Sequence, residues 1–160
     1  MMKFKTLFLR AALLFLVAAV SLLGIFWFWQ IVKKMLQIYP GIGWAAIVFG
    51  VAIYVSALLF FGAVFYAWKI LNLVDQENTF SAAALVDLRR LKLFILGMAA
   101  AYACFLPAIF VVGDQEDAPG IILMFGLLVG LPLVVATFIG ILEKLLQRAL
   151  FLQVENDLTV

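Results

Sequence analysis

Four long stretches of this sequence contain no Asp, Glu, Lys or Arg, and each has about the length of a membrane helix. They cover residues 11–32, 43–68, 93–112 and 121–142. A helix needs about 20 mostly apolar residues to cross a bilayer. Membrane β-strands are shorter and alternate apolar with polar residues, whereas these stretches are apolar throughout. The sequence therefore predicts four membrane-spanning helices.

The composition supports the same conclusion. The chain has 160 residues, of which 68% are hydrophobic and 12% are charged, whereas soluble domains carry about 25% charged residues. There is too little polar surface to cover a water-soluble globule. We expect an all-α integral membrane four-helix bundle, with residues 1–160 forming a single membrane domain of two antiparallel hairpins.

The first stretch resembles a secretory signal peptide, because three basic residues precede an apolar run. That run continues to Val32, however, which is longer than a signal peptide requires, and no small-x-small cleavage pattern ends it. We expect the first helix to be retained as a membrane span.

The basic residues predict how the helices are oriented. Cytoplasmic loops of membrane proteins carry an excess of Lys and Arg. Placing both termini in the cytoplasm puts nine basic residues there and leaves two, Lys33 and Lys34, on the other side. The sequence therefore favours a membrane protein with both termini in the cytoplasm, a cytoplasmic loop at residues 69–92 and a cytoplasmic tail at residues 143–160.

The cytoplasmic loop contains a helix start. Ser81 is a favourable N-cap, and the apolar Phe80 precedes it. Apolar residues then recur at helical spacing into the third span. We expect one helix to run from the loop into the membrane, with Arg89, Arg90 and Lys92 among the lipid headgroups, where each gains about 1 kcal/mol near anionic lipid. Asp87 and Arg90 are expected to form an exposed pair.

The tail is expected to continue the fourth span as an amphipathic helix. Together with the loop helix, it either lies on the membrane surface or binds a soluble partner, and the sequence leaves both open. The residues proposed for docking are Phe80, Ser81, Arg89, Arg90, Glu155, Asn156 and Asp157.

Small residues and prolines in the spans have two interpretations each. Glycines allow helices to pack closely in lipid, and the candidates are Gly50, Gly97, Gly126 and Gly130. We favour packing within one bundle over a homo-oligomer interface. Pro107 and Pro132 are either hinges beside a cavity or tolerated kinks.

Nothing in the sequence indicates catalysis. The chain has no histidine and one cysteine, which excludes Cys/His zinc sites. The spans contain no ionisable carboxylate or basic residue for a proton pathway. Three acidic residues at positions 114, 116 and 117 share one short loop and are interpreted as solvent-exposed. We expect no catalytic, cofactor or metal site, and the net charge of +2 does not suggest direct binding to nucleic acid.

Two segments resemble a known family. The loop sequence ENTFS followed by LVDLRRLK, and the closing VENDLTV, are similar to those of domain-of-unknown-function family 2975, whose members are small bacterial membrane proteins with four predicted spans. The loop has Asn78-Thr79-Phe80 where an Asn-Pro-Phe-like element is expected.

The resemblance implies no established activity. It does imply a neighbour, because many members are encoded beside a small helix-turn-helix regulator. The leading hypothesis is a non-enzymatic membrane partner of such a regulator, in contact with membrane lipids. The alternative is a small transporter or channel subunit for an uncharged or lipophilic molecule.

Overall fold

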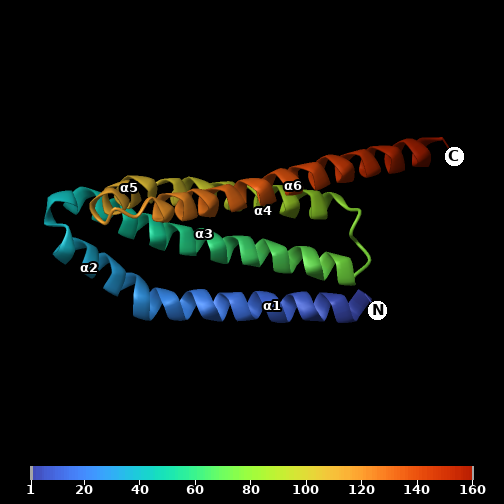
Figure 1. The fold of residues 1–160 in the computed structure, drawn as a ribbon. Helices are drawn as coiled ribbons and strands as arrows, with labels where there is room; N and C mark the ends of the chain where they lie inside the picture. Colours follow the sequence, from blue (N-terminus) through green and yellow to red (C-terminus); the bar gives the residue numbers. More distant parts are fainter. Residues whose placement is uncertain (1, 160) are drawn as a thin grey trace.

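The computed structural model describes residues 2–159, and these residues form long helices that run side by side (Figure 1). The α-helices are α1 (Met2–Leu23), α2 (Trp29–Ile38), α3 (Gly43–Asp75), α4 (Ala82–Ala103), α5 (Leu106–Gln115) and α6 (Pro119–Leu158). Four helical segments are long and apolar enough to cross a membrane: Lys3–Ile38, Pro40–Asp75, Ala82–Gln115 and Pro119–Leu158. The predicted all-α membrane fold with four long apolar helices is confirmed.

Two of the four segments are interrupted within their length. A π-helical turn, Gly24–Phe28, joins α1 to α2 without ending the helix. Between α4 and α5 the α-helix stops at Ala103, four residues before Pro107. Because proline has no backbone N–H, Pro107 cannot donate the helical hydrogen bond that the carbonyl of Ala103 would otherwise accept. Pro132 lies inside α6, which continues through it.

The helices define two ends of the molecule. At the turn end, Pro40–Ile42 forms a short 3-10 helix between α2 and α3, and residues 116–118 connect α5 to α6. At the terminal end, α1 begins, α6 ends, and residues 76–81 connect α3 to α4 (Figure 1). Glu77 and Asp117 adopt positive φ angles of 60° and 50° in the connections that follow α3 and α5, which is the conformation a sharp reversal after a helix often requires.

The central helix of the bundle is α4, which packs against α3 on one side and α6 on the other. The first helix, α1, packs mainly against α3, and Figure 1 shows it on the opposite side of α3 from α6. The most apolar part of the first span has no buried residue. In a bilayer this helix is therefore surrounded largely by lipid.

The buried apolar core lies toward the turn end. Ala46 and Ala108 are completely buried, and the rings of Phe49 and Phe105 pack with their centroids 4.9 Å apart. The alanines let neighbouring backbones approach closely, which is how helices associate in lipid. The cluster consists of Met35, Ala45, Ala46, Phe49, Ala52, Ile53, Phe105, Ala108 and Ile109.

The four glycines proposed for helix packing fall into two groups. A Cβ atom on Gly50 would lie 3.0 Å from Val32, and one on Gly97 would lie 3.1 Å from Leu59. A Cβ atom on Gly126 or on Gly130 would have no neighbouring atom within 4 Å. The first two therefore face neighbouring helices, and the GxxxG pair in α6 faces open space.

Candidate functional site

The loop at the terminal end leads into a capped helix. The Ser81 hydroxyl accepts a hydrogen bond from the Ala84 N–H at 3.2 Å and donates one to the Asn78 carbonyl at 2.8 Å. Ser81 itself is extended, and α4 begins one residue later. The predicted N-cap and the helix that runs on into the third span are both confirmed. Phe80 precedes the cap with its side chain exposed.

A buried carboxylate connects α4 to α6. Glu143 accepts hydrogen bonds from Arg89 Nε at 2.9 Å and from Lys92 Nζ at 2.5 Å, and only 8% of its side chain is exposed. We call these three residues the Glu143 cluster. Two cations offset the cost of removing one carboxylate from water.

The Glu143 cluster was not predicted from the sequence. Arg89 and Lys92 were expected to lie among lipid headgroups, and in the structure they pair with α6. The signal in the sequence is weak but present, because Ile139, Glu143 and Leu146 are spaced to share one helix face and all three are buried.

The expected exposed pair between Asp87 and Arg90 is wrong. Asp87 is buried, with 9% of the residue exposed, because it lies three residues from the buried Ala84 on the inward face of α4. Arg90 instead donates a hydrogen bond to the Tyr66 hydroxyl at 3.3 Å, and its guanidinium lies 5.8 Å from the centroid of that ring. Arg90 thus helps to hold α4 against α3.

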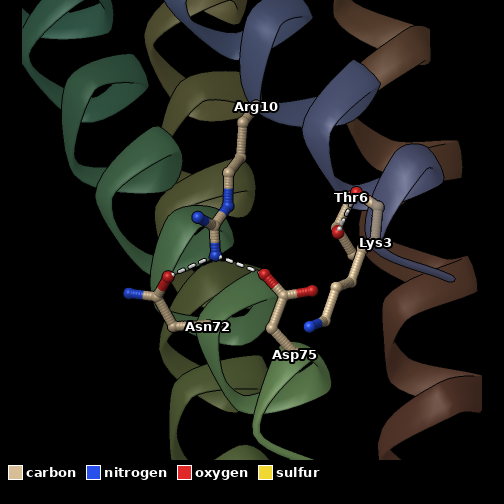
Figure 2. A network of polar contacts seen from close by, with 5 residues as sticks. All are labelled: Lys3, Thr6, Arg10, Asn72 and Asp75. Atoms are coloured by element: carbon tan, nitrogen blue, oxygen red, sulfur yellow. Dashed lines mark hydrogen bonds and ion pairs between the residues drawn. The ribbon is translucent and has the colours of Figure 1, made fainter.

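A second polar cluster holds α1 to α3 (Figure 2). Arg10 Nη2 donates to Asn72 Oδ1 at 2.6 Å and to Asp75 Oδ2 at 2.7 Å. The Arg10 guanidinium also lies over the Trp68 ring, 5.2 Å from its centroid. We call Arg10, Trp68, Asn72 and Asp75 the Arg10 cluster. Within the described residues, Arg10 Nε is buried and has no hydrogen-bond partner.

The turn end has one polar contact between its two connections. The Tyr39 hydroxyl donates a hydrogen bond to Glu116 Oε1 at 2.5 Å. This bond to a carboxylate favours the protonated phenol and raises the pKa of Tyr39 above its ordinary value. The other two acidic residues of this loop, Asp114 and Asp117, are exposed. Among the described residues no group of three His, Cys, Asp or Glu side chains is placed to hold a metal ion.

The end of α6 extends beyond the other helices (Figure 1). Every residue from 151 to 159 is exposed, including Phe151, Leu152 and Leu158. Glu155, Asn156 and Asp157 lie on this segment. The residues proposed for docking therefore fall in two places, around the start of α4 and on the exposed end of α6.

Comparison with known proteins identifies the family. The family model described as "Protein of unknown function (DUF2975)" matches residues 30–160. This chain belongs to that family. The match includes the loop, α4 and the tail, which carry the resemblance, and it leaves residues 1–29 outside.

This chain is also similar to one curated relative over its whole length. The uncharacterized membrane protein YoaS of Bacillus subtilis (strain 168) is 29% identical to this chain, and the match spans the whole of both chains. No solved structure matches this chain. The relative is described as a membrane protein, in agreement with the four apolar helices of this chain, and neither the family nor the relative carries an assigned activity.

Apolar hollows lie beside both polar clusters. A pocket of about 340 Å³ between α3, α4 and α6 is lined by residues that include Leu73, Phe80, Ala84, Leu88 and Leu146. A larger groove of about 590 Å³ has walls from α1, α3, α4 and α6, and Pro132 is among its lining residues. Pro107 does not line either hollow.

Proposed function

We propose that this chain is a non-enzymatic membrane protein that binds a cytoplasmic protein through the exposed end of α6 and the neighbouring start of α4. The observation that carries the proposal is that every residue from 151 to 159 is exposed, at the end of a helix that bears Phe151, Leu152 and Leu158. Exposed apolar side chains of this size on a helix are typical of a binding surface for another protein.

The distribution of basic residues supports a cytoplasmic position for this surface. The terminal end carries nine of the eleven Lys and Arg residues, and the turn end carries Lys33 and Lys34. Under the positive-inside rule the terminal end faces the cytoplasm. Both proposed docking regions then lie on the side of the membrane where a soluble regulator is present.

The charge of the tail suits a basic partner. Glu155 and Asp157 give the exposed end of α6 two carboxylates, and the last basic residue before them is Arg148. Proteins that bind DNA carry positive surfaces. A small helix-turn-helix regulator, the partner class implied by the family resemblance, is therefore chemically compatible with the tail.

Co-purification from membranes tests this proposal. The full-length protein is tagged and expressed with a small helix-turn-helix regulator, taken from the neighbouring gene where that gene encodes one, and the regulator recovered per membrane protein is measured. We expect the double variants Phe151→Ala/Leu152→Ala and Glu155→Lys/Asp157→Lys each to lower recovery about tenfold or more, because they remove the apolar and the charged parts of the surface.

The matched control keeps the tail intact. Leu123 and Leu127 are as exposed as the tail residues but lie in the uncharged part of α6, so Leu123→Ala/Leu127→Ala should leave recovery unchanged. Full recovery of the regulator by both tail variants would contradict the proposal.

A second candidate function rests on the groove. Its four-helix apolar lining and the presence of Pro132 in its wall favour a transporter or channel subunit for an uncharged or lipophilic molecule, which needs few polar contacts. Flux of such a molecule into reconstituted vesicles, lowered by Pro132→Ala and not by Pro107→Ala, would support this function. Equal flux with and without protein would exclude it for the molecule tested.

A further inference from the structure

The groove of about 590 Å³ lies at the depth of the membrane's hydrocarbon layer. Leu13 and Leu16 of α1 form one wall, and Leu131 and Val135 of α6 form the opposite one. The floor comes from α3 and α4, and nearly every lining residue falls within the four uncharged stretches of the sequence. In a bilayer the molecules that reach such a groove from the side are lipids.

At the terminal end the groove leads to Arg10. Arg10 precedes Leu13 by three residues, and Leu13 precedes Leu16 by three, so these side chains share one stripe of α1. Leu13 and Leu16 line the groove, and Arg10 therefore lies one turn further along the same face. This position is the boundary between the uncharged span and the charged end of the helix.

The Arg10 guanidinium has donors to spare. Both of its hydrogen bonds to Asn72 and Asp75 come from Nη2, and Figure 2 draws no contact to the other terminal nitrogen. Nε is buried without a partner among the described residues. Because Nε is enclosed by the protein, the donor left for an external acceptor is the other terminal nitrogen, Nη1.

The charge of the terminal end indicates the sign of that acceptor. Nine basic and six acidic residues lie at this end, whereas the turn end has two basic and three acidic residues. Arginine is a preferred side chain for binding phosphate, and the free donors of Arg10 are those of Nη1, because both hydrogens of Nη2 are engaged. The lipid that fits both the groove and its charged end is therefore an anionic phospholipid.

We propose that the groove between α1 and α6 holds an acyl chain of one anionic phospholipid, whose phosphate accepts hydrogen bonds from Arg10. The lipid comes from the leaflet at the terminal end of the protein. It replaces the helix contact that α1 and α6 would make in a closed bundle. This site does not depend on the proposed cytoplasmic partner or on transport.

Native mass spectrometry of the full-length protein in detergent tests the headgroup contact. The probes are phosphatidylglycerol and phosphatidylcholine with identical acyl chains, offered separately, and the lipid retained per protein is counted. We expect one phosphatidylglycerol to be retained about tenfold more strongly than phosphatidylcholine. Arg10→Gln should remove this preference, because the guanidinium supplies the donors.

A second variant separates lipid binding from helix attachment. Asp75→Asn breaks the same ion pair from the other side but leaves Arg10 free to bind phosphate, so it should retain phosphatidylglycerol at least as well as the unchanged protein. A purely structural role for the ion pair predicts equal losses in Arg10→Gln and Asp75→Asn, and that result would overturn the proposal.

The groove itself is tested by two neighbouring substitutions that leave the Arg10 cluster intact. Val135 lines the groove, whereas Val134 is 68% exposed and is not among the lining residues. Val135→Trp should fill the groove and abolish retention of phosphatidylglycerol, and Val134→Trp should not. Equal retention of the two lipids by the unchanged protein, or equal effects of the two tryptophans, would show surface lipid only and would overturn the proposal.

Discussion

The two ends of this molecule are held together by different interactions. Toward the turn end, the rings of Phe49 and Phe105 pack among alanines that are completely buried. Toward the terminal end, the Glu143 cluster and the Arg10 cluster hold the helices, and apolar hollows lie between them. A hollow of about 410 Å³ also borders Phe49 and Phe105, so the two ends differ in the interactions that hold the helices and not in whether they leave space.

The two ends also differ in charge and in exposed surface. The turn end is built from short connections and packed aromatic rings, which suits a fixed base for the bundle. The terminal end combines open hollows, excess positive charge and a projecting helix. Both of our proposals, the docking surface and the lipid site, therefore use the terminal end.

The largest effect is expected from removing a ring at the turn end. The Phe105 ring packs against those of Phe49, Tyr102 and Phe125, so Phe105→Ala should lower the free energy of unfolding by about 3 kcal/mol. Unfolding by SDS in mixed micelles measures this change. Phe110→Ala is the matched control, because Phe110 is exposed in α5, and a similar loss in both variants would contradict a core at this end.

A smaller effect is expected at the terminal end. Glu143→Gln keeps the shape of the side chain and removes the charge that Arg89 and Lys92 share. Breaking a fully buried pair costs about 3–5 kcal/mol, but the Arg89 side chain is 53% exposed and can turn toward water. We therefore expect a loss of about 1–2 kcal/mol in the same unfolding assay.

The exposed Glu155 provides the control for that variant. Glu155→Gln removes a carboxylate from the same helix where no ion pair is present among the described residues, and it should leave the unfolding free energy unchanged. A Glu143→Gln protein as stable as Glu155→Gln would show that the polar clusters do not hold the terminal end.

The smallest effect concerns the polar contact at the turn end. The pKa of Tyr39 is raised by its hydrogen bond to Glu116, so the contribution of this contact is complete below the ordinary tyrosine pKa and is lost as pH rises through the raised value. Tyrosinate absorbance during an alkaline titration should show one late-titrating group fewer in Tyr39→Phe than in the unchanged protein. Identical titration curves after allowing for one fewer tyrosine would contradict the contact.

Much of the fold could be predicted from the sequence because it depends on local patterns. Uncharged stretches of sufficient length identify four spans, and the Ser81 N-cap identifies the start of α4. The continuous helix through the end of the fourth span follows from its helical spacing. Each of these features is determined by residues that are near one another in the chain.

The contacts between helices could not be predicted in the same way. Glu143 and Lys92 are 51 residues apart in the sequence, and no local pattern shows that they meet. Asp87 was assigned to the exposed side of its helix because charged residues usually lie there, and the packing of α4 between α3 and α6 overrides that expectation. The sequence therefore indicated which segments form the candidate site but not which side chains pair within it.

The most direct test of the account is the side of the membrane on which each end lies. Cysteines are introduced at Ala83, near the start of α4, and at Gln115, the last residue of α5 at the turn end, both of which are exposed. The background is Cys104→Ala, which removes the native cysteine. With a membrane-impermeant maleimide applied to intact cells and to inverted vesicles, we expect Ala83→Cys to react only from the cytoplasmic side and Gln115→Cys only from outside. Reaction of Gln115→Cys from the cytoplasmic side would contradict the proposed orientation and, with it, the docking function of the terminal end.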